Sequence, residues 1–310
     1  MRAGRFTKVR AGGQAVAMSA DTPTRREPPT VVVDAGDVTG RLPDFGEAWV
    51  FRDLLRALIV RDVTVRYRQA AVGVLWAVVQ PLTQLALWAT LFGLLGRTPA
   101  TGRSPYLLSA LCGLVFWQFV ATTVTSAGSS LLNNREMVTK IYFPRAFLPL
   151  AAAGAACLDT AVGLGCLLVA MAIGFASGGG AAPGVVGLLV GLPLGVGMVL
   201  ATTAGLSCAL AGWTALYRDF RFVTPFLVQV LFFTTPVVYE SGLVAEKYPA
   251  LVWAWAVQPF VGAFALIRWG LLGTPFPGAW VLVSVVTSIA VLVGGLIALN
   301  DASDEIADRI

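Results

Sequence analysis

The chain has 310 residues, of which 57% are hydrophobic and only 13% are charged. A soluble domain carries about 25% charged residues, so this composition excludes an ordinary soluble globular domain and favours a protein embedded in a membrane. Histidine is absent and none of the three lysines follows a glycine, which excludes histidine-based catalysis, histidine metal sites and a P-loop ATPase site within these residues. We expect no catalytic residue and no metal site.

The chain begins with a polar segment followed by an amphipathic pattern. Residues 1–44 are rich in Arg, Gly, Pro and Thr and contain no apolar core of a signal peptide, which predicts a disordered tail and leaves residues 45–310 as the membrane domain. Met18 is as plausible a start as Met1. From Glu47 to Ile59, apolar residues recur at helical spacing; they are Phe51, Leu54, Leu55, Leu58 and Ile59. This pattern predicts a helix that lies in the lipid headgroup plane or packs on a soluble partner.

Six apolar stretches are long enough to cross a bilayer, for which about 20 residues are needed. They are residues 72–95, 106–128, 146–176, 185–213, 222–239 and 278–299. Residues 243–273 are also apolar but are broken by prolines, which predicts two short re-entrant or surface-lying helices before the last span, or one further crossing. The predicted fold is therefore an all-α polytopic membrane protein with six transmembrane helices.

The basic residues orient these spans. Of the 22 Lys and Arg residues, 18 fall on one side, namely before the first span, in the second and fourth loops and in the tail. The other side holds four. The positive-inside rule then predicts that both termini and the loops 129–145 and 214–221 are cytoplasmic.

Small and polar residues within the spans predict contacts between helices. In the fourth span, Gly184, Gly187, Gly191 and Gly195 have overlapping GxxxG spacing, which predicts a seam where helix backbones approach closely. Asp159 is the one carboxylate deep within a span. It either belongs to a transport pathway or forms a hydrogen bond across helices.

Two predicted cytoplasmic loops carry charge. Residues 133–145 read NNREMVTKIYFPR and have helical amphipathic spacing that Pro144 ends before the third span. This segment is either a contact for a cytosolic motor or an ordinary basic loop. Residues 217–221 read YRDFR and form a charged turn between two spans, whose simplest role is charge neutralisation at the helix ends.

Three blocks of the sequence carry a family resemblance. The first reads RDVTVRYRQ (61–69), GVLW (73–76) and QPL (80–82); the second SLLNN (130–134), KIYFPR (140–145) and LP (148–149); the third YRDFR (217–221), PF (225–226) and TPVVY (235–239). In order and spacing they resemble the transmembrane subunits of ABC transporters that export lipid-linked polysaccharides such as O-antigen and teichoic acid. The resemblance extends from about residue 47 to the C-terminus. The chain departs from the family pattern at Gln258-Pro259, where Asn-Pro is common, and in its acidic tail, residues 300–305.

The resemblance implies partners and a direction of transport. It implies a homodimer in the bacterial plasma membrane, surrounded by membrane lipids, with a path between the subunits and two copies of a separate cytosolic ATPase. The ATPase would hold ATP and Mg²⁺, while this chain would hold no cofactor and contact no nucleic acid. The substrate would be a polysaccharide on polyprenyl diphosphate, moved from the cytoplasmic to the outer side.

Roles for particular residues follow from the same resemblance. Coupling to the ATPase would involve Asn134, Arg135, Glu136, Lys140, Tyr142, Phe143, Arg145, Arg218 and Asp219, and residues 47–59 would form the interfacial helix. By residue type and position, the candidates to line the path are Trp76, Gln80, Phe116, Trp117, Gln118, Gln229 and Tyr239. Two other functions remain open: an ABC permease for a drug, lipid or small lipo-oligosaccharide, and a membrane-embedded enzyme or ion-coupled carrier, which would need more buried polar residues than Asp159.

Overall fold

The computed structural model describes residues 7–11, 14–18, 51–68, 75–94, 106–134, 136–137, 144–176 and 183–309, and the chain divides into two compact units, Met1–Arg41 and Leu42–Ile310. In the first unit, β1 (Thr7–Ala11) and β2 (Gln14–Met18) pair as an antiparallel hairpin. Gly12 and Gly13 separate them in the sequence, a pair typical of two-residue hairpin turns. The segment 1–44, predicted to be disordered, thus contains a hairpin, and its other residues lie outside the described part of the chain.

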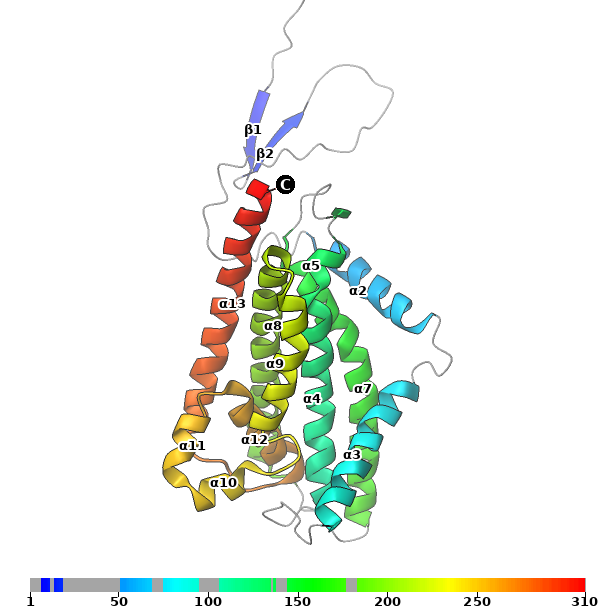
Figure 1. Ribbon diagram of the computed structural model, residues 1–310, viewed down its shortest axis with the longest axis vertical. Coiled ribbons are helices and arrows are strands. Elements are labelled where there is room, and N and C mark those ends of the chain that lie inside the picture. The colour runs from blue at the N-terminus through cyan, green and yellow to red at the C-terminus, as the bar shows by residue number, and fades with distance from the viewer. Residues whose placement is uncertain are drawn as a thin grey trace, which may run out of the picture. The chain divides into compact units, whose positions relative to one another are not determined.

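All the secondary-structure elements described in the second unit are helices (Figure 1). In chain order the helices are α2 (Arg52–Tyr67), α3 (Trp76–Leu94), α4 (Tyr106–Gly128), α5 (Ser130–Asn133), α7 (Phe147–Ala176), the π-helical turn η3 (Gly187–Gly191), α8 (Leu192–Leu216), α9 (Phe220–Thr234), α10 (Ser241–Lys247), α11 (Pro249–Trp255), α12 (Pro259–Leu272) and α13 (Val281–Arg309). Figure 1 shows α5 and the C-terminal end of α13 at one end of this unit, and α10 and α11 at the opposite end. We call these the α5 end and the α10 end.

Five helices are long and apolar enough to cross a membrane among the described residues: α3, α4, α7, α8 with η3, and α13. They correspond to five of the six predicted spans. The remaining predicted span, 222–239, is shorter in the structure, because α9 ends at Thr234. Thr235 is extended, with φ −88° and ψ 140°, as expected for a residue that precedes proline. At 1.5 Å per residue, the 15 residues of α9 reach only about 22 Å, which is less than the roughly 30 Å of a hydrocarbon core.

The proline-broken region contains three short helices rather than the two predicted. Pro249 and Pro259 occupy the first turns of α11 and α12, where proline is well tolerated, and Gly273 ends α12 in the left-handed conformation with φ 63°. The axes of α11 and α12 differ by 112°. The chain therefore turns back between them instead of continuing as one straight span, and α12 is inserted into the core, where nearly all of its residues are buried.

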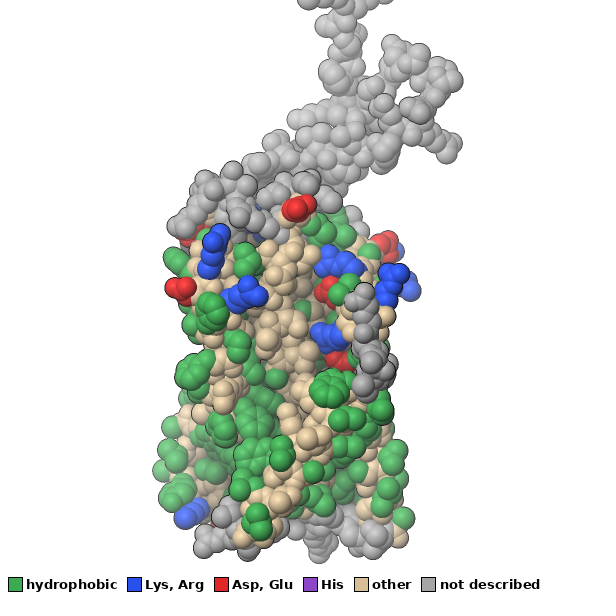
Figure 2. All heavy atoms as spheres, turned by 45° about the vertical axis from the view of Figure 1, so that its right-hand side comes forward, with side chains coloured by type: hydrophobic (Ala, Val, Ile, Leu, Met, Phe, Trp, Pro, Cys, Tyr) green, Lys and Arg blue, Asp and Glu red, His purple; other side chains and the backbone are tan. Residues whose placement is uncertain are grey.

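The core forms around α4 and α12. In α4, 78% of the apolar window is buried, whereas in α3 the share is 6%. The large side chains Phe260 and Phe264 of α12 are buried among residues of α4 and α8, including Leu114 and Val199. The helix α3 is thus the least covered of the long helices. Figure 2 shows most charged side chains toward the α5 end of one face and hydrophobic side chains below them, as a bilayer requires.

The glycine seam predicted for the fourth span packs on α12. An added Cβ at Gly187 would meet the Trp269 carbonyl oxygen at 2.9 Å, and one at Gly195 would meet the Ala263 carbonyl oxygen at 2.9 Å. An added Cβ at Gly191 would meet the Trp269 ring at 2.5 Å, whereas one at Gly184 would have no neighbour within 4 Å. The close-packing prediction is therefore confirmed for three of its four glycines.

Candidate functional site

The amphipathic helix predicted at the start of the membrane domain is α2, but its bounds and its surroundings differ from the prediction. It spans Arg52–Tyr67, two turns beyond Ile59, while residues 47–50 lie outside the described residues. Its apolar side chains, Phe51, Leu54, Leu55, Leu58 and Ile59, join a cluster at the α5 end that includes Phe147 and Leu148 of α7. Leu58 is buried and the other four are partly covered. The apolar face of α2 thus packs on the chain's own helices.

The deep carboxylate Asp159 is bound by the last turn of α2. The Arg66 Nη1 atom donates to Asp159 Oδ2 at 2.6 Å, and the Tyr67 hydroxyl donates to Asp159 Oδ1. The neighbouring Thr160 bonds only within its helix, to the Ala156 carbonyl oxygen at 2.9 Å. Of the two roles predicted for Asp159, the geometry favours hydrogen bonding between helices. A paired, hydrogen-bonded carboxylate is also far less costly within a membrane than a lone one.

The described residues of the second predicted cytoplasmic loop lie at the α5 end. Asn134 donates from Nδ2 to the Ser130 carbonyl oxygen at 2.8 Å and closes α5, while Glu136 is exposed. Arg145 donates from Nη1 to the Ser303 carbonyl oxygen and so joins the start of α7 to the end of α13. The other predicted coupling residues of this loop, Arg135, Lys140, Tyr142 and Phe143, lie outside the described residues.

The predicted charged turn between α8 and α9 is exposed at the same end. Arg218 and Asp219 are both exposed, above a cluster in which the Phe220 ring lies 5.5 Å from Trp213 and 6.3 Å from Tyr217. The backbone N–H of Phe222 donates to the Asp219 carbonyl oxygen at 3.0 Å and begins α9. The turn therefore exposes two opposite charges next to a packed cluster of three aromatic rings.

The structure does not bring all of the predicted path residues to one surface. Phe116 and Trp117 are 5% and 4% exposed and belong to the core of the chain. Trp117 packs edge-on against Phe232 of α9 at 5.6 Å and against Phe260 of α12 at 6.2 Å. Gln118 is partly buried and donates to the Thr122 hydroxyl at 3.1 Å. These residues of α4 hold the bundle together rather than forming its outer face.

The remaining path candidates lie on α3, on α9 and just after α9. Trp76 and Gln229 are exposed, and Gln80 is partly exposed. The two helices contact each other, because Trp88 of α3 lies 5.9 Å from Phe232 of α9. The exposed residues of these two helices are together called here the α3–α9 face. Exposed aromatic rings of α9 that the sequence did not suggest extend this face; they are Phe222, Phe226 and Phe233.

The end of α9 is tied to the bend between α11 and α12. Gln258 donates from Nε2 to the hydroxyls of Thr234 and Thr235 at 3.0 and 2.8 Å, and Trp255 donates to the Thr234 carbonyl oxygen at 2.7 Å. Tyr239 stacks on Trp255 with 6.1 Å between ring centres and donates to the Phe233 carbonyl oxygen at 3.2 Å. Gln258 therefore connects the end of α9 to the bend between α11 and α12.

A buried arginine of α12, which the sequence did not single out, organises the same end. Arg268 is 3% exposed and donates to the carbonyl oxygens of Ser109 (3.2 Å), Pro236 (2.6 Å) and Val237 (2.5 Å). An added Cβ at Gly113 would meet the Val237 carbonyl and the guanidinium, so only glycine allows this approach. The guanidinium thus joins α4, α12 and the extended segment after α9.

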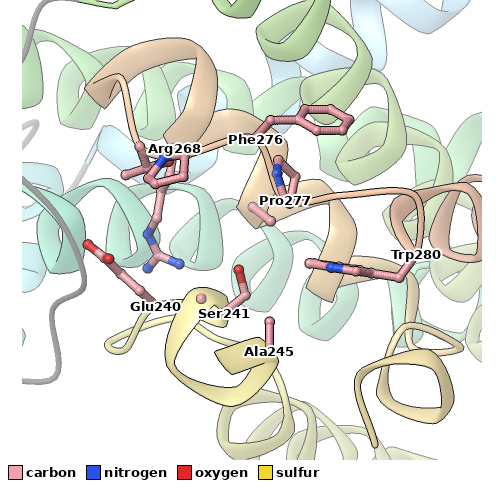
Figure 3. Close-up of a pocket in the computed structure, with 11 residues that line it drawn as sticks. Glu240, Ser241, Ala245, Arg268, Phe276, Pro277 and Trp280 are labelled. Carbon is pink, nitrogen blue, oxygen red and sulfur yellow. The ribbon is translucent and has the colours of Figure 1, made fainter. Parts of the chain in front are cut away.

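Beside Arg268 lies a small cavity of about 120 Å³. Figure 3 shows Arg268 and Glu240 toward one side of it and Trp280 toward the other. Ser241, Thr274 and three residues of the proline-rich turn, Pro275, Phe276 and Pro277, complete most of its lining. This cavity has room for a few water molecules and is far smaller than the 300–1,000 Å³ typical of ligand pockets.

Together, these helices define a multi-pass membrane protein with charged residues gathered at the α5 end and two contacting, outward-facing helices, α3 and α9. Residues 53–272 match the ABC-2 type transporter family, and the chain belongs to this family. The matched region runs from α2 to the end of α12 and includes Asp159, the charged turn between α8 and α9, and Arg268. ABC transporter permeases of this kind are not themselves catalytic.

Named relatives are similar over about two thirds of the chain. Two proteins of Klebsiella pneumoniae, each called O-antigen export system permease protein RfbA, are 27% and 26% identical to the chain over 204 and 201 residues. Each alignment covers 64% of this chain and 74% of the relative. A protein of the same name from Myxococcus xanthus is 27% identical over 201 residues, which cover 65% of this chain and 74% of that relative.

Proposed function

We propose that this chain is the membrane-spanning subunit of an ATP-driven exporter that moves a polyprenyl-diphosphate-linked polysaccharide from the cytoplasmic to the outer side of the bacterial plasma membrane. The observation that carries this proposal is the family match over residues 53–272 together with relatives named for O-antigen export. A large polar polymer cannot cross hydrocarbon without a lined path, whereas its lipid anchor can stay in the leaflet.

The ABC-2 family implies a partner ATPase, which would bind ATP and Mg²⁺ at the α5 end of two permease copies. The exposure of Glu136, Arg218 and Asp219 at this end supports the coupling role proposed for residues 134–145 and 218–219. The bond from Arg145 to Ser303 supports transmission of ATPase motion into α13. The basic residues counted in the sequence support an arrangement with this end in the cytoplasm.

A path between two copies of the chain would use the α3–α9 face. Low burial of α3 and the exposed rings of α9 support this choice, because sugar rings bind to aromatic faces and to amide groups such as those of Gln80 and Gln229. Trp76 and Tyr239 would lie near the two ends of the path lining that the α3–α9 face provides. Phe116, Trp117 and Gln118 would support this lining from behind, since they pack inside the chain.

The proposal is tested by depletion of the gene and complementation with the wild-type chain. We expect full-length polyprenyl-linked polymer to accumulate inside and surface polymer to disappear, and both to recover on complementation. Mass spectrometry of extracted lipid-linked polymer and labelling of surface polymer measure the two pools. Normal surface glycan, with altered sensitivity to a small hydrophobic drug, would instead support a permease for drugs, lipids or small lipo-oligosaccharides.

A further inference from the structure

The pair formed by Asp159 and Arg66 lies well away from the α5 end. Asp159 is the thirteenth residue of α7, so at 1.5 Å per residue it lies about 18 Å along the helix from Phe147. The whole of α7, with 30 residues, measures about 45 Å, the thickness of a bilayer with its headgroups. The last turn of α2 must reach this depth, because Arg66 and Tyr67 both bond to Asp159.

The helix α2 therefore descends along α7 instead of lying flat at its end. Ile59 packs over Gly154, where an added Cβ would meet the Ile59 Cγ1 atom at 2.7 Å. Seven residues further on, Arg66 meets Asp159, five residues beyond Gly154. Both helices thus advance in the same direction, and Figure 1 shows α2 sloping away from the α5 end.

The two contacts of α2 constrain it differently. The contact of its apolar face with Phe147 and Leu148 is non-directional and would tolerate sliding or rotation of α2. The contact at Asp159 is directional, because each carboxylate oxygen accepts from a different side chain, and a charged hydrogen bond has narrow geometry. The side chains of Arg66 and Asp159 are 29% and 16% exposed, so the protein covers most of the pair.

The end of α2 lies close in the chain to the start of α3. Only eight residues separate Tyr67 from Trp76, the first residue of α3. Trp76 is exposed and Gln80 partly exposed in the first turns of α3, on the face proposed above as a wall of the path. The last turn of α2 therefore closely precedes, in the sequence, two candidates for the lining of the path.

We propose that Asp159 is a positioning residue: with Arg66 and Tyr67 it anchors the last turn of α2 at a fixed depth along α7. It acts neither as a proton carrier nor as a contact for the transported molecule. The inference rests on the proposed function only in its consequence for export; the anchoring itself is independent of what is transported.

A cross-link between α2 and α7 tests the anchor. In a cysteine-free chain, Ile59→Cys with Gly154→Cys places two Cβ atoms within about 4 Å, since Cγ1 of Ile59 is one bond from its Cβ. This suits a disulfide, whose Cβ atoms lie about 3.5–4.5 Å apart. Inverted membrane vesicles that contain the partner ATPase are divided into oxidised and reduced halves. Export is measured as ATP-dependent protection of polyprenyl-linked glycan from an added glycosidase.

Asp159→Asn keeps the size of the side chain and removes its charge. We expect the reduced vesicles to lose export at least about tenfold and to cross-link more slowly, and oxidation to restore export to near the level of the oxidised parent. Thr160→Ala, next to Asp159 but bonded only within α7, is the matched control and should change neither quantity. Asp159→Glu keeps the charge and should retain most export, which covers the case in which Asp159→Asn fails to insert.

The outcomes separate the possible roles of Asp159. Rescue of Asp159→Asn by the cross-link supports positioning. A cross-linked Asp159→Asn chain that stays inactive would mean that the carboxylate acts on the transported molecule or on a proton. Loss of export when the parent is cross-linked would mean that α2 must leave α7 during transport. Either result overturns the proposal. The rate of cross-linking reports on the anchor even if the transported molecule is not a glycan, and an unchanged rate in Asp159→Asn also overturns it.

Discussion

The carbonyl contacts of Arg268 lead to a quantitative prediction for stability. Arg268→Met keeps a long side chain in α12 but removes the donors to the carbonyls of Ser109, Pro236 and Val237. A buried carbonyl left without a donor costs about 1–3 kcal/mol, while removal of a buried charge regains part of the total. We therefore expect the substitution to lower the free energy of unfolding by about 3 kcal/mol.

The assay is equilibrium unfolding of the purified protein in mixed micelles, followed by tryptophan fluorescence. Arg221→Met, at an exposed position, is the matched control and should change stability by less than about 0.5 kcal/mol. Arg268→Lys should fall between the two, because an ammonium group cannot donate in the fixed fork that spans α4 and the segment after α9. Wild-type stability of Arg268→Met would refute the reasoning, since it would mean that methionine packing compensates fully for the lost contacts.

Three further predictions concern topology, coupling and packing. A cysteine that replaces Arg135 in a cysteine-free chain should react with an impermeant thiol reagent only after the cytoplasmic side is opened, and labelling of intact cells would contradict the orientation. Lys140→Glu should reduce export about tenfold without loss of insertion; normal export with intact ATPase binding would make the loop a simple connector. Gly295→Ala should destabilise the protein by about 2 kcal/mol in the same unfolding assay, because its Cβ would meet the Gly205 backbone. Gly294→Ala, with no neighbour within 4 Å, should have no such effect, and equal behaviour of the two would disprove the close approach of α8 and α13.

Local patterns in the sequence predicted the elements but not the contacts between distant ones. Hydropathy located five long helices because a bilayer demands about 20 apolar residues at each crossing. It overextended the fifth span past Thr234, since Pro236 interrupts the helix while the apolar run continues to Tyr239. The glycine spacing in the fourth span likewise predicted a seam, but not that α12 is its partner.

The site residues show the same limit. Periodicity ended the amphipathic helix at Ile59, whereas α2 continues to Tyr67, where Asp159, distant in the sequence, binds its last turn. Residue type alone made Trp117 a candidate for the path, but its ring is enclosed by Phe232 and Phe260 from two other helices. An arginine in an apolar helix indicates that its guanidinium N–H groups need hydrogen-bond acceptors. Only the fold shows that backbone carbonyls are the acceptors of Arg268.

The central claim is export of a lipid-linked glycan by this chain together with an ATPase. The most direct measurement uses proteoliposomes in which the purified permease and its co-purifying ATPase are incorporated with polyprenyl-diphosphate-linked polysaccharide. We predict that ATP moves the glycan to the luminal leaflet, seen as protection from an added glycosidase, and that neither ATP without the permease nor a non-hydrolysable ATP analogue gives protection. Equal protection with and without the permease, or protection that does not depend on ATP hydrolysis, would contradict the claim.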